Sequence, residues 1–161
     1  MLSPEVEMNH IELSAPTSAL AQHLLVLAST VKETQFQAHL IHFNYEGANF
    51  FSVHQFLKEE YDELLEEFDS IGEYVRSLDY MMPMCACGLK DMMHKSFKNV
   101  SSYDGREMLA TYLMNLELIC EIATCIEEKA AELKASDIAN YLGELCGKVN
   151  KAAWMVKATL R

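Results

Sequence analysis

Apolar side chains recur at helical spacing along four long stretches of this sequence. The stretches run from about Ser14 to His42 or Tyr45, from about Phe50 to Leu78, from Ser102 or Asp104 to about Leu133, and from Ser136 onward. Six Gly and three Pro are too few to interrupt them often, so the pattern predicts a single all-α domain. The positions expected in the core are Leu20, Leu24, Leu27, Val31, Phe36, Leu40, Phe43, Phe56, Leu57, Leu64, Leu65, Phe68, Ile71, Val75, Leu109, Tyr112, Leu113, Leu116, Ile119, Ile122, Ile138, Leu142, Leu145, Val149, Trp154 and Val156.

The ends of these stretches carry helix-boundary residues. Ser14 or Thr17 is expected to cap the first helix, Ser102 or Asp104 the third and Ser136 the fourth. Gly47 is expected to supply the left-handed backbone at the turn between the first two helices. The second helix then approaches about thirty residues, a length that fits a bundle of long helices around one core.

The connection between the second and third helices is long. Pro83 and Gly88 break the pattern between Asp79 and Val100, where we expect a short helix over Leu89–His94. A connection of this length fits a crossover that carries the chain back along the bundle. We therefore expect a flexible acidic arm over residues 1–13 and one domain over residues 14–161.

Charge and cysteine usage narrow the function classes. The net charge of -11 and the absence of Lys and Arg from residues 1–31 argue against binding to DNA, which requires clustered cations. Five Cys without a framework spacing indicate free thiols in a reducing compartment. The first residues lack the basic region followed by an apolar core that is typical of a signal peptide, and no apolar run reaches about eighteen residues, so we expect a cytoplasmic protein with no membrane partner.

Two histidines and two acids form the candidate chemistry. His42 and His54 flank the predicted turn, whereas Asp69 and Glu73 share one face of the second helix at i,i+4 spacing. His54 and Asp69 are fifteen residues apart, which is about 22 Å along a straight helix, so one ion cannot bridge them within a chain. Two chains related by a twofold axis would complete two mixed sites, whose imidazole and carboxylate ligands suit iron, zinc or manganese.

The segment that carries these residues resembles the signature of the Dps proteins, the mini-ferritins named for DNA protection in starved cells. The matching residues, in the family's own spacing, are His42, Asn44, Gly47, Phe50, His54, Asp69 and Glu73. The resemblance implies a ferritin-like four-helix bundle that assembles into a hollow homododecamer. It also implies iron storage and an Fe(II)-oxidising (ferroxidase) site at each twofold interface, with His42, His54, Asp69 and Glu73 as ligands. The expected oxidant is preferably hydrogen peroxide, with oxygen left open as the alternative. Zinc or another divalent ion would fit the same ligands.

Three positions depart from the family pattern. Phe43 stands where the family has a tryptophan that donates an electron, which leaves radical quenching to Trp154 or nearby tyrosines. Lys58 replaces an acid that helps to hold the second iron, and Asn140 replaces a pore acid near Asp137 and Glu144. These departures support an alternative, a Dps-like cage with weak or lost ferroxidase activity that acts as a metal-binding shell.

Two further clusters have simpler explanations. The run Met81–Cys87 holds soft sulfur ligands that Cu(I) prefers, but Met also fills irregular gaps in a core, and we favour a hydrophobic plug under the connection. The acid run from Glu59 to Glu67 is interpreted as a solvated face, although acids that line a cavity could also nucleate iron mineral. His39 is left out of the site because no motif requires it.

Overall fold

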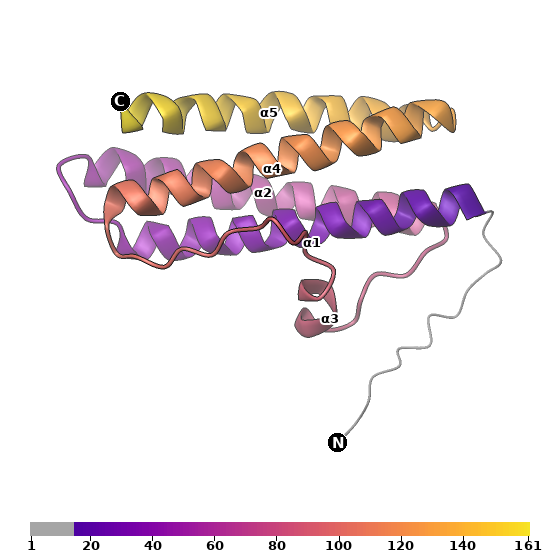
Figure 1. Ribbon diagram of the computed structural model, residues 1–161, viewed down its shortest axis with the longest axis horizontal. Helices are drawn as coiled ribbons and strands as arrows, with labels where there is room; N and C mark the ends of the chain where they lie inside the picture. Colours follow the sequence, from indigo (N-terminus) through magenta and orange to yellow (C-terminus); the bar gives the residue numbers. More distant parts are fainter. Residues whose placement is uncertain (1–14) are drawn as a thin grey trace, which may run out of the picture.

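The computed structural model describes the backbone of residues 15–161 and the side chains from residue 17 onward. The described chain forms five helices and no strand, which confirms the predicted all-α fold (Figure 1). The helices are α1 (Ala15–Asn44), α2 (Phe50–Ser77), α3 (Ala86–Lys90), α4 (Gly105–Glu132) and α5 (Ser136–Leu160). The expected arm over residues 1–13 and the expected cap at Ser14 lie outside the described residues.

The four long helices form two antiparallel hairpins that pack side by side. α1 pairs with α2 and α4 pairs with α5, while α1 also packs against α4 and α2 against α5. α2 ends at one end of the bundle and α4 begins at the other, so the connection must run the length of the molecule (Figure 1). It does so along α1, which it also contacts through α3. The predicted crossover is therefore present.

A buried amide network holds this crossover against the bundle. Asn115 of α4 is fully buried and uses both ends of its amide on the backbone of Lys98: Nδ2 donates to the Lys98 carbonyl at 2.7 Å, and Oδ1 accepts from the Lys98 N–H at 2.9 Å. Gln37 of α1 donates to the same carbonyl and accepts a second Asn115 bond. These bonds satisfy polar backbone that a loop packed on a helix would otherwise leave unpaired.

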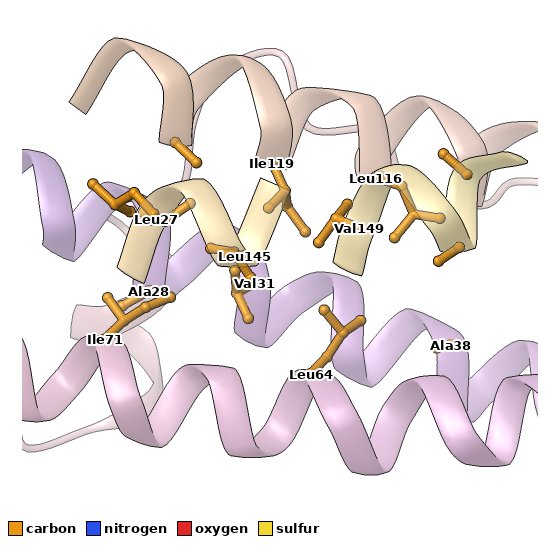
Figure 2. Packing of buried hydrophobic residues seen from close by; sticks show 14 of the residues in the cluster. Leu27, Ala28, Val31, Ala38, Leu64, Ile71, Leu116, Ile119, Leu145 and Val149 are labelled. Carbon is orange, nitrogen blue, oxygen red and sulfur yellow. The ribbon is translucent and has the colours of Figure 1, made fainter. Parts of the chain in front are cut away.

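The core lies between all four long helices (Figure 2). Leu27 and Val31 of α1, Leu64 of α2, Ile119 of α4 and Val149 of α5 are among its labelled members. Five positions expected in the core are exposed instead, namely Phe36, Leu40, Phe43, Leu65 and Trp154. Helical spacing identifies apolar stripes but does not tell whether a stripe faces the chain's own bundle or its outside, which explains these errors.

Helix boundaries follow the sequence closely, with two corrections. Asp104 caps α4 as expected, because its Oδ1 accepts from the Glu107 N–H at 3.0 Å. Ser136 is not a cap: it is the first residue of α5, and Ala135 takes the cap position without a side-chain bond. The turn before it is too tight for a separate cap. The N–H groups of Lys134 and Ala135 already bond the carbonyls of Ala131 and Ala130 at the end of α4.

The short helix also lies earlier than predicted. It spans Ala86–Lys90 instead of Leu89–His94 because Cys85 caps it, its sulfur accepting from the Gly88 N–H at 3.2 Å. Gly88, interpreted as a breaker, therefore belongs to the helix. At the first turn, Gly47 has φ +147°, a positive value that favours glycine but not the left-handed helical conformation expected there.

Among the described helices, α4 alone is long and apolar enough to cross a membrane. Its apolar residues are used by the bundle, since Tyr112, Leu116 and Ile119 are fully buried against the other helices. The composition of α4 is therefore that of a core helix.

Candidate metal centre

His42 and His54 meet across the turn between α1 and α2. Their rings stack with centroids 3.6 Å apart and planes 19° from parallel. Nδ1 of His42 lies 2.8 Å from the carbonyl oxygen of His54, and Nδ1 of His54 lies 2.9 Å from the carbonyl oxygen of His42. Each histidine is thus fixed by the backbone of the other.

These reciprocal bonds determine which ring nitrogen is available. A carbonyl oxygen can only accept, so each Nδ1 carries a proton and donates it, and each neutral ring keeps its lone pair on Nε2. A histidine that binds a metal commonly donates its second ring N–H to a carbonyl in this way, which orients the ring. The backbone bonds of His42 and His54 therefore leave both Nε2 atoms available to bind a metal.

Other rings surround this pair. His39 stacks on Tyr61 at 4.0 Å and on Phe43 at 4.8 Å, and the Tyr61 ring lies 5.3 Å from that of His42. Trp154, on α5, is 63% exposed and makes no ring contact in the described part of the chain. Of the side chains considered for radical quenching, Tyr61 is therefore the one whose ring contacts His42. The sequence did not single out Tyr61. The one-turn spacing of His39 and His42 was the only signal for this stack.

Asp69 and Glu73 form the acid half of the candidate site. Both are exposed on α2, and both line an open hollow of about 910 Å³ between α2 and the start of the crossover. No hydrogen bond or ion pair joins either carboxylate to another described residue, whereas Lys32 lines the same hollow. The two carboxylates share one face, as their spacing predicted, and are free to bind a cation.

The histidine pair and the acid pair do not meet within one chain. α2 is one continuous helix from Phe50 to Ser77, so the separation of about 22 Å between His54 and Asp69 holds along its axis. Among residues 15–161, no group of three or more His, Cys, Asp and Glu side chains lies close enough to hold a metal ion. Neither pair of side chains is joined by a third such residue within the described chain.

Lys58 lies one helical turn after His54, at the position where the Dps pattern has an acid. Its Nζ is 2.8 Å from Asp62 Oδ2 and 5.2 Å from the centroid of the Tyr61 ring. The hydrogen bond and the charge of Asp62 raise the pKa of Lys58, so the side chain stays cationic. Any metal at the His54 end therefore lies near a fixed positive charge.

The acid run on α2 is not wholly solvated, contrary to prediction. Glu60 is 8% exposed and accepts from the Tyr112 hydroxyl at 2.9 Å. Glu67 is 4% exposed and accepts from the Tyr141 hydroxyl at 2.7 Å and from Lys148 at 2.6 Å. The partners come from α4 and α5, which a reading of α2 alone could not reveal.

The remaining candidates lie on the surface. Met84 and Cys85 are exposed and line the hollow that holds Asp69 and Glu73, whereas Met82 packs against the core. The expected hydrophobic plug is thus limited to Met82. Asn140, Asp137 and Glu144 are all exposed near the beginning of α5.

Comparison with known proteins identifies the family of this chain. The family described as "Ferritin-like domain" matches residues 32–161 of the chain. The chain belongs to the ferritin-like family. No curated protein matches this ferritin-like chain significantly in sequence.

Solved structures confirm the predicted ferritin-like bundle and the resemblance to Dps at the level of the fold. The ferritin-like chain is similar to an archaeal Dps homologue from Halobacterium salinarum, with TM-score 0.88 and 21% identity over 100% of this chain and 93% of that one. It is similar to Dps from Vibrio cholerae O1, with TM-score 0.85 and 22% identity over 96% and 97% of the two chains. The Vibrio protein is described as a member of a broad superfamily of ferritin-like diiron-carboxylate proteins. A Dps protein from Bacillus brevis has TM-score 0.85 and 20% identity over 92% and 99%.

Proposed function

We propose that this chain is an iron-storing mini-ferritin that oxidises Fe(II) at sites shared between two subunits. His42 and His54 of one subunit and Asp69 and Glu73 of another supply the ligands. The subunits assemble as twofold dimers into a hollow homododecamer in the cytoplasm, and the Fe(III) product is stored inside it as mineral. Membership of the ferritin-like family and similarity to Dps structures over nearly the whole chain support this proposal.

One observation carries the proposal: a prepared histidine pair and an unpaired acid pair lie on the same helical hairpin but too far apart to cooperate. Two Nε2 atoms are presented by reciprocal backbone bonds, and two carboxylates line an open hollow. A twofold axis that brings two hairpins together in antiparallel fashion joins each histidine pair to the acids of the other subunit.

The proposed reaction transfers two electrons at once. Two Fe(II) substrate ions give one electron each to hydrogen peroxide, whose O–O bond breaks, and two protons complete two molecules of water. Pairing the electrons avoids the one-electron route to hydroxyl radical. The chain supplies ligands and position, whereas the redox chemistry is that of iron. Tyr61 is the side chain placed to quench a stray oxidant, since Phe43 is much harder to oxidise.

Subunit complementation tests the shared site directly. His42→Ala and Asp69→Ala each remove one half-site. Each homo-oligomer is therefore expected to oxidise Fe(II) no faster than peroxide oxidises it in solution without protein. When the two variants are co-expressed, half of the randomly formed dimers are mixed, and one of the two sites in each mixed dimer is intact. About a quarter of the wild-type rate should return. The rate of Fe(II) oxidation is measured by adding Fe(II) anaerobically, then adding peroxide, and following the ultraviolet absorbance of Fe(III).

Two results would contradict the proposal. Failure of the co-expressed variants to regain any activity, in assemblies of wild-type mass, would place the site within one chain. Equal rates for wild-type protein and both single variants would remove the ferroxidase and leave a metal-binding shell without catalysis. Titration with Zn²⁺ distinguishes this shell from a chain that binds no metal, because zinc accepts the same imidazole and carboxylate ligands.

A further inference from the structure

Two cysteines face each other across the α4–α5 interface. The Cys120 thiol is directed at the carbonyl oxygen of Cys146 at 3.9 Å, and the Cys146 thiol is directed at the carbonyl oxygen of Cys120 at 3.9 Å. This reciprocal arrangement means that each Cβ–Sγ bond points at the backbone of the other residue.

The arrangement suits a disulfide. A disulfide requires the two Cα atoms to lie about 4.4–6.8 Å apart with the side chains directed at each other. α4 and α5 are packed as an antiparallel pair, and each thiol lies 3.9 Å from the carbonyl oxygen of the other cysteine, so the two side chains are directed at each other's residue.

A small oxidant can reach this pair. Both cysteines are half-buried, and each has an exposed polar neighbour: Cys120 Sγ donates to Asn150 Oδ1 at 3.3 Å, and Thr124 Oγ1 lies 3.8 Å from Cys146 Sγ. Both residues are only partly buried, so the pair is not sealed from solvent.

The two sulfur atoms have different surroundings. Burial, followed by the charge and hydrogen bond of Cys146 and the charges of Glu117 and Glu121, raises the pKa of Cys120 to about 12. Cys120 therefore keeps its proton at neutral pH. Because a thiol that keeps its proton is a poor nucleophile, Cys120 is the sulfur that attacks second.

We propose that Cys120 and Cys146 form a second peroxide-consuming site, which uses no metal and leaves a disulfide between α4 and α5. Cys146 Sγ attacks one peroxide oxygen and the O–O bond breaks, which gives a sulfenic acid on Cys146 and a first molecule of water. Cys120 Sγ then attacks the Cys146 sulfur, and its proton leaves with the hydroxyl group as a second molecule of water. The two thiols supply two electrons, which reduce one peroxide.

The experiment uses the full-length, metal-free assembly and does not depend on iron oxidation. Wild-type protein is treated with one equivalent of hydrogen peroxide per chain, the remaining thiols are alkylated, and peptides are mapped by mass spectrometry. We expect two of the five thiols to be lost and a peptide that links Cys120 to Cys146 within one chain. In Cys120→Ser, the sulfenic acid on Cys146 should persist and be trapped by dimedone. Cys125→Ser, which removes an exposed thiol, is the matched control and should still lose two thiols.

Other oxidation patterns would overturn the proposal. One is a linkage between Cys85 and Cys87, or between different chains, while Cys120 and Cys146 stay reduced. Another is trapping of sulfenic acid on Cys120 instead of Cys146 in the corresponding single variants. If Cys120→Ser fails to fold, the cross-linked peptide from wild-type protein decides the matter alone, because it is read without any variant.

Discussion

Glu60 is a carboxylate in a position that suits a neutral side chain. It is nearly buried, and desolvation raises its pKa to about 7, helped by the charges of Glu63 and Glu59, while the hydrogen bond from Tyr112 acts in the opposite direction. The unfolded chain releases this proton near pH 4.5 and the folded chain near pH 7. Stability therefore falls as pH rises between these two values, and the full cost of the buried charge is present above pH 7.

The variant Glu60→Gln should remove that cost. Glutamine is neutral and its oxygen can still accept from Tyr112. At pH 8 we expect the free energy of unfolding to rise by roughly 3 kcal/mol, with little change at pH 4. Urea unfolding at both pH values measures this difference. Glu66→Gln, at an exposed position of the same helix, is the control, and an equal effect of Glu60→Gln at both pH values would contradict the assignment.

Lys58 is the residue expected to limit the second metal position. In the proposed site, Lys58→Asp replaces a repelling cation with a carboxylate one turn from His54. We expect the weaker of two metal-binding steps to tighten at least about tenfold, because the charge near the divalent ion changes by two. Calorimetric titration with Zn²⁺ measures both steps. Lys151→Asp, exposed on α5, should change neither step, and an unaltered second step in Lys58→Asp would exclude this role.

At the residue scale, the sequence predicted which side chains carry the chemistry but not how they are held. His42, His54, Asp69 and Glu73 could be selected because spacing alone ties them to a turn and to one helix face. The reciprocal bonds of the two histidines depend on how α1 and α2 cross. Burial of Glu60 and Glu67 depends on Tyr112, Tyr141 and Lys148, which are distant in sequence. Such contacts become visible only once helices pack.

Lys134 occupies an unfavourable backbone conformation at the turn between α4 and α5. Its φ is +59°, in the left-handed region, while its N–H binds the Ala131 carbonyl and the following N–H binds the Ala130 carbonyl. This is the helix ending at which glycine is most common. A residue with a side chain in this conformation lowers the stability of the folded state by about 1–2 kcal/mol.

Lys134→Gly should therefore stabilise the protein by about 1 kcal/mol, because glycine adopts this conformation without strain. The thermal midpoint at fixed protein concentration should rise by a few degrees. The same substitution in the interior of α5, Lys151→Gly, serves as the control and should lower the midpoint. Destabilisation by both substitutions would show that the turn does not limit stability.

At the element scale, the long helices were predictable because their apolar stripes and boundary residues agree. Asp104 combines cap chemistry with an apolar run that follows it, so the start of α4 was placed correctly. α3 was misplaced because its cap is a cysteine sulfur, which no boundary rule anticipates. Ser136 has the chemistry of a cap, but the tight ending of α4 left no position for one.

The whole molecule has an apolar face that its own bundle does not cover. Phe36, Leu40 and Phe43 follow each other at helical spacing on α1, and Phe36 and Phe43 are 54% and 66% exposed. The sequence assigned all three to the core, since a stripe that packs against another copy has the same pattern as one that packs inside. Under the proposed function, this face lies at the interface between subunits.

Leu40→Glu should prevent that association. A charge placed in the centre of the stripe must be desolvated when a second copy binds, so we expect sedimentation to show monomers in place of an assembly of twelve 18.3 kDa chains. Fe(II) oxidation should be lost with it, because each site needs two subunits. Gln22→Glu, also exposed on α1, should keep the wild-type mass. A Leu40→Glu protein that still sediments with the wild-type assembly would place the interface elsewhere.

The crossover from Leu78 to Asp104 separates two hairpins that each pair local neighbours. Each hairpin can form early during folding because its helices are adjacent in sequence, and docking of the two must wait for closure of the long connection. All four proposed ligands lie on the first hairpin, so the second one can accumulate substitutions without touching a ligand. Evolutionary change in stability and change in metal chemistry can therefore proceed on different halves of the same gene.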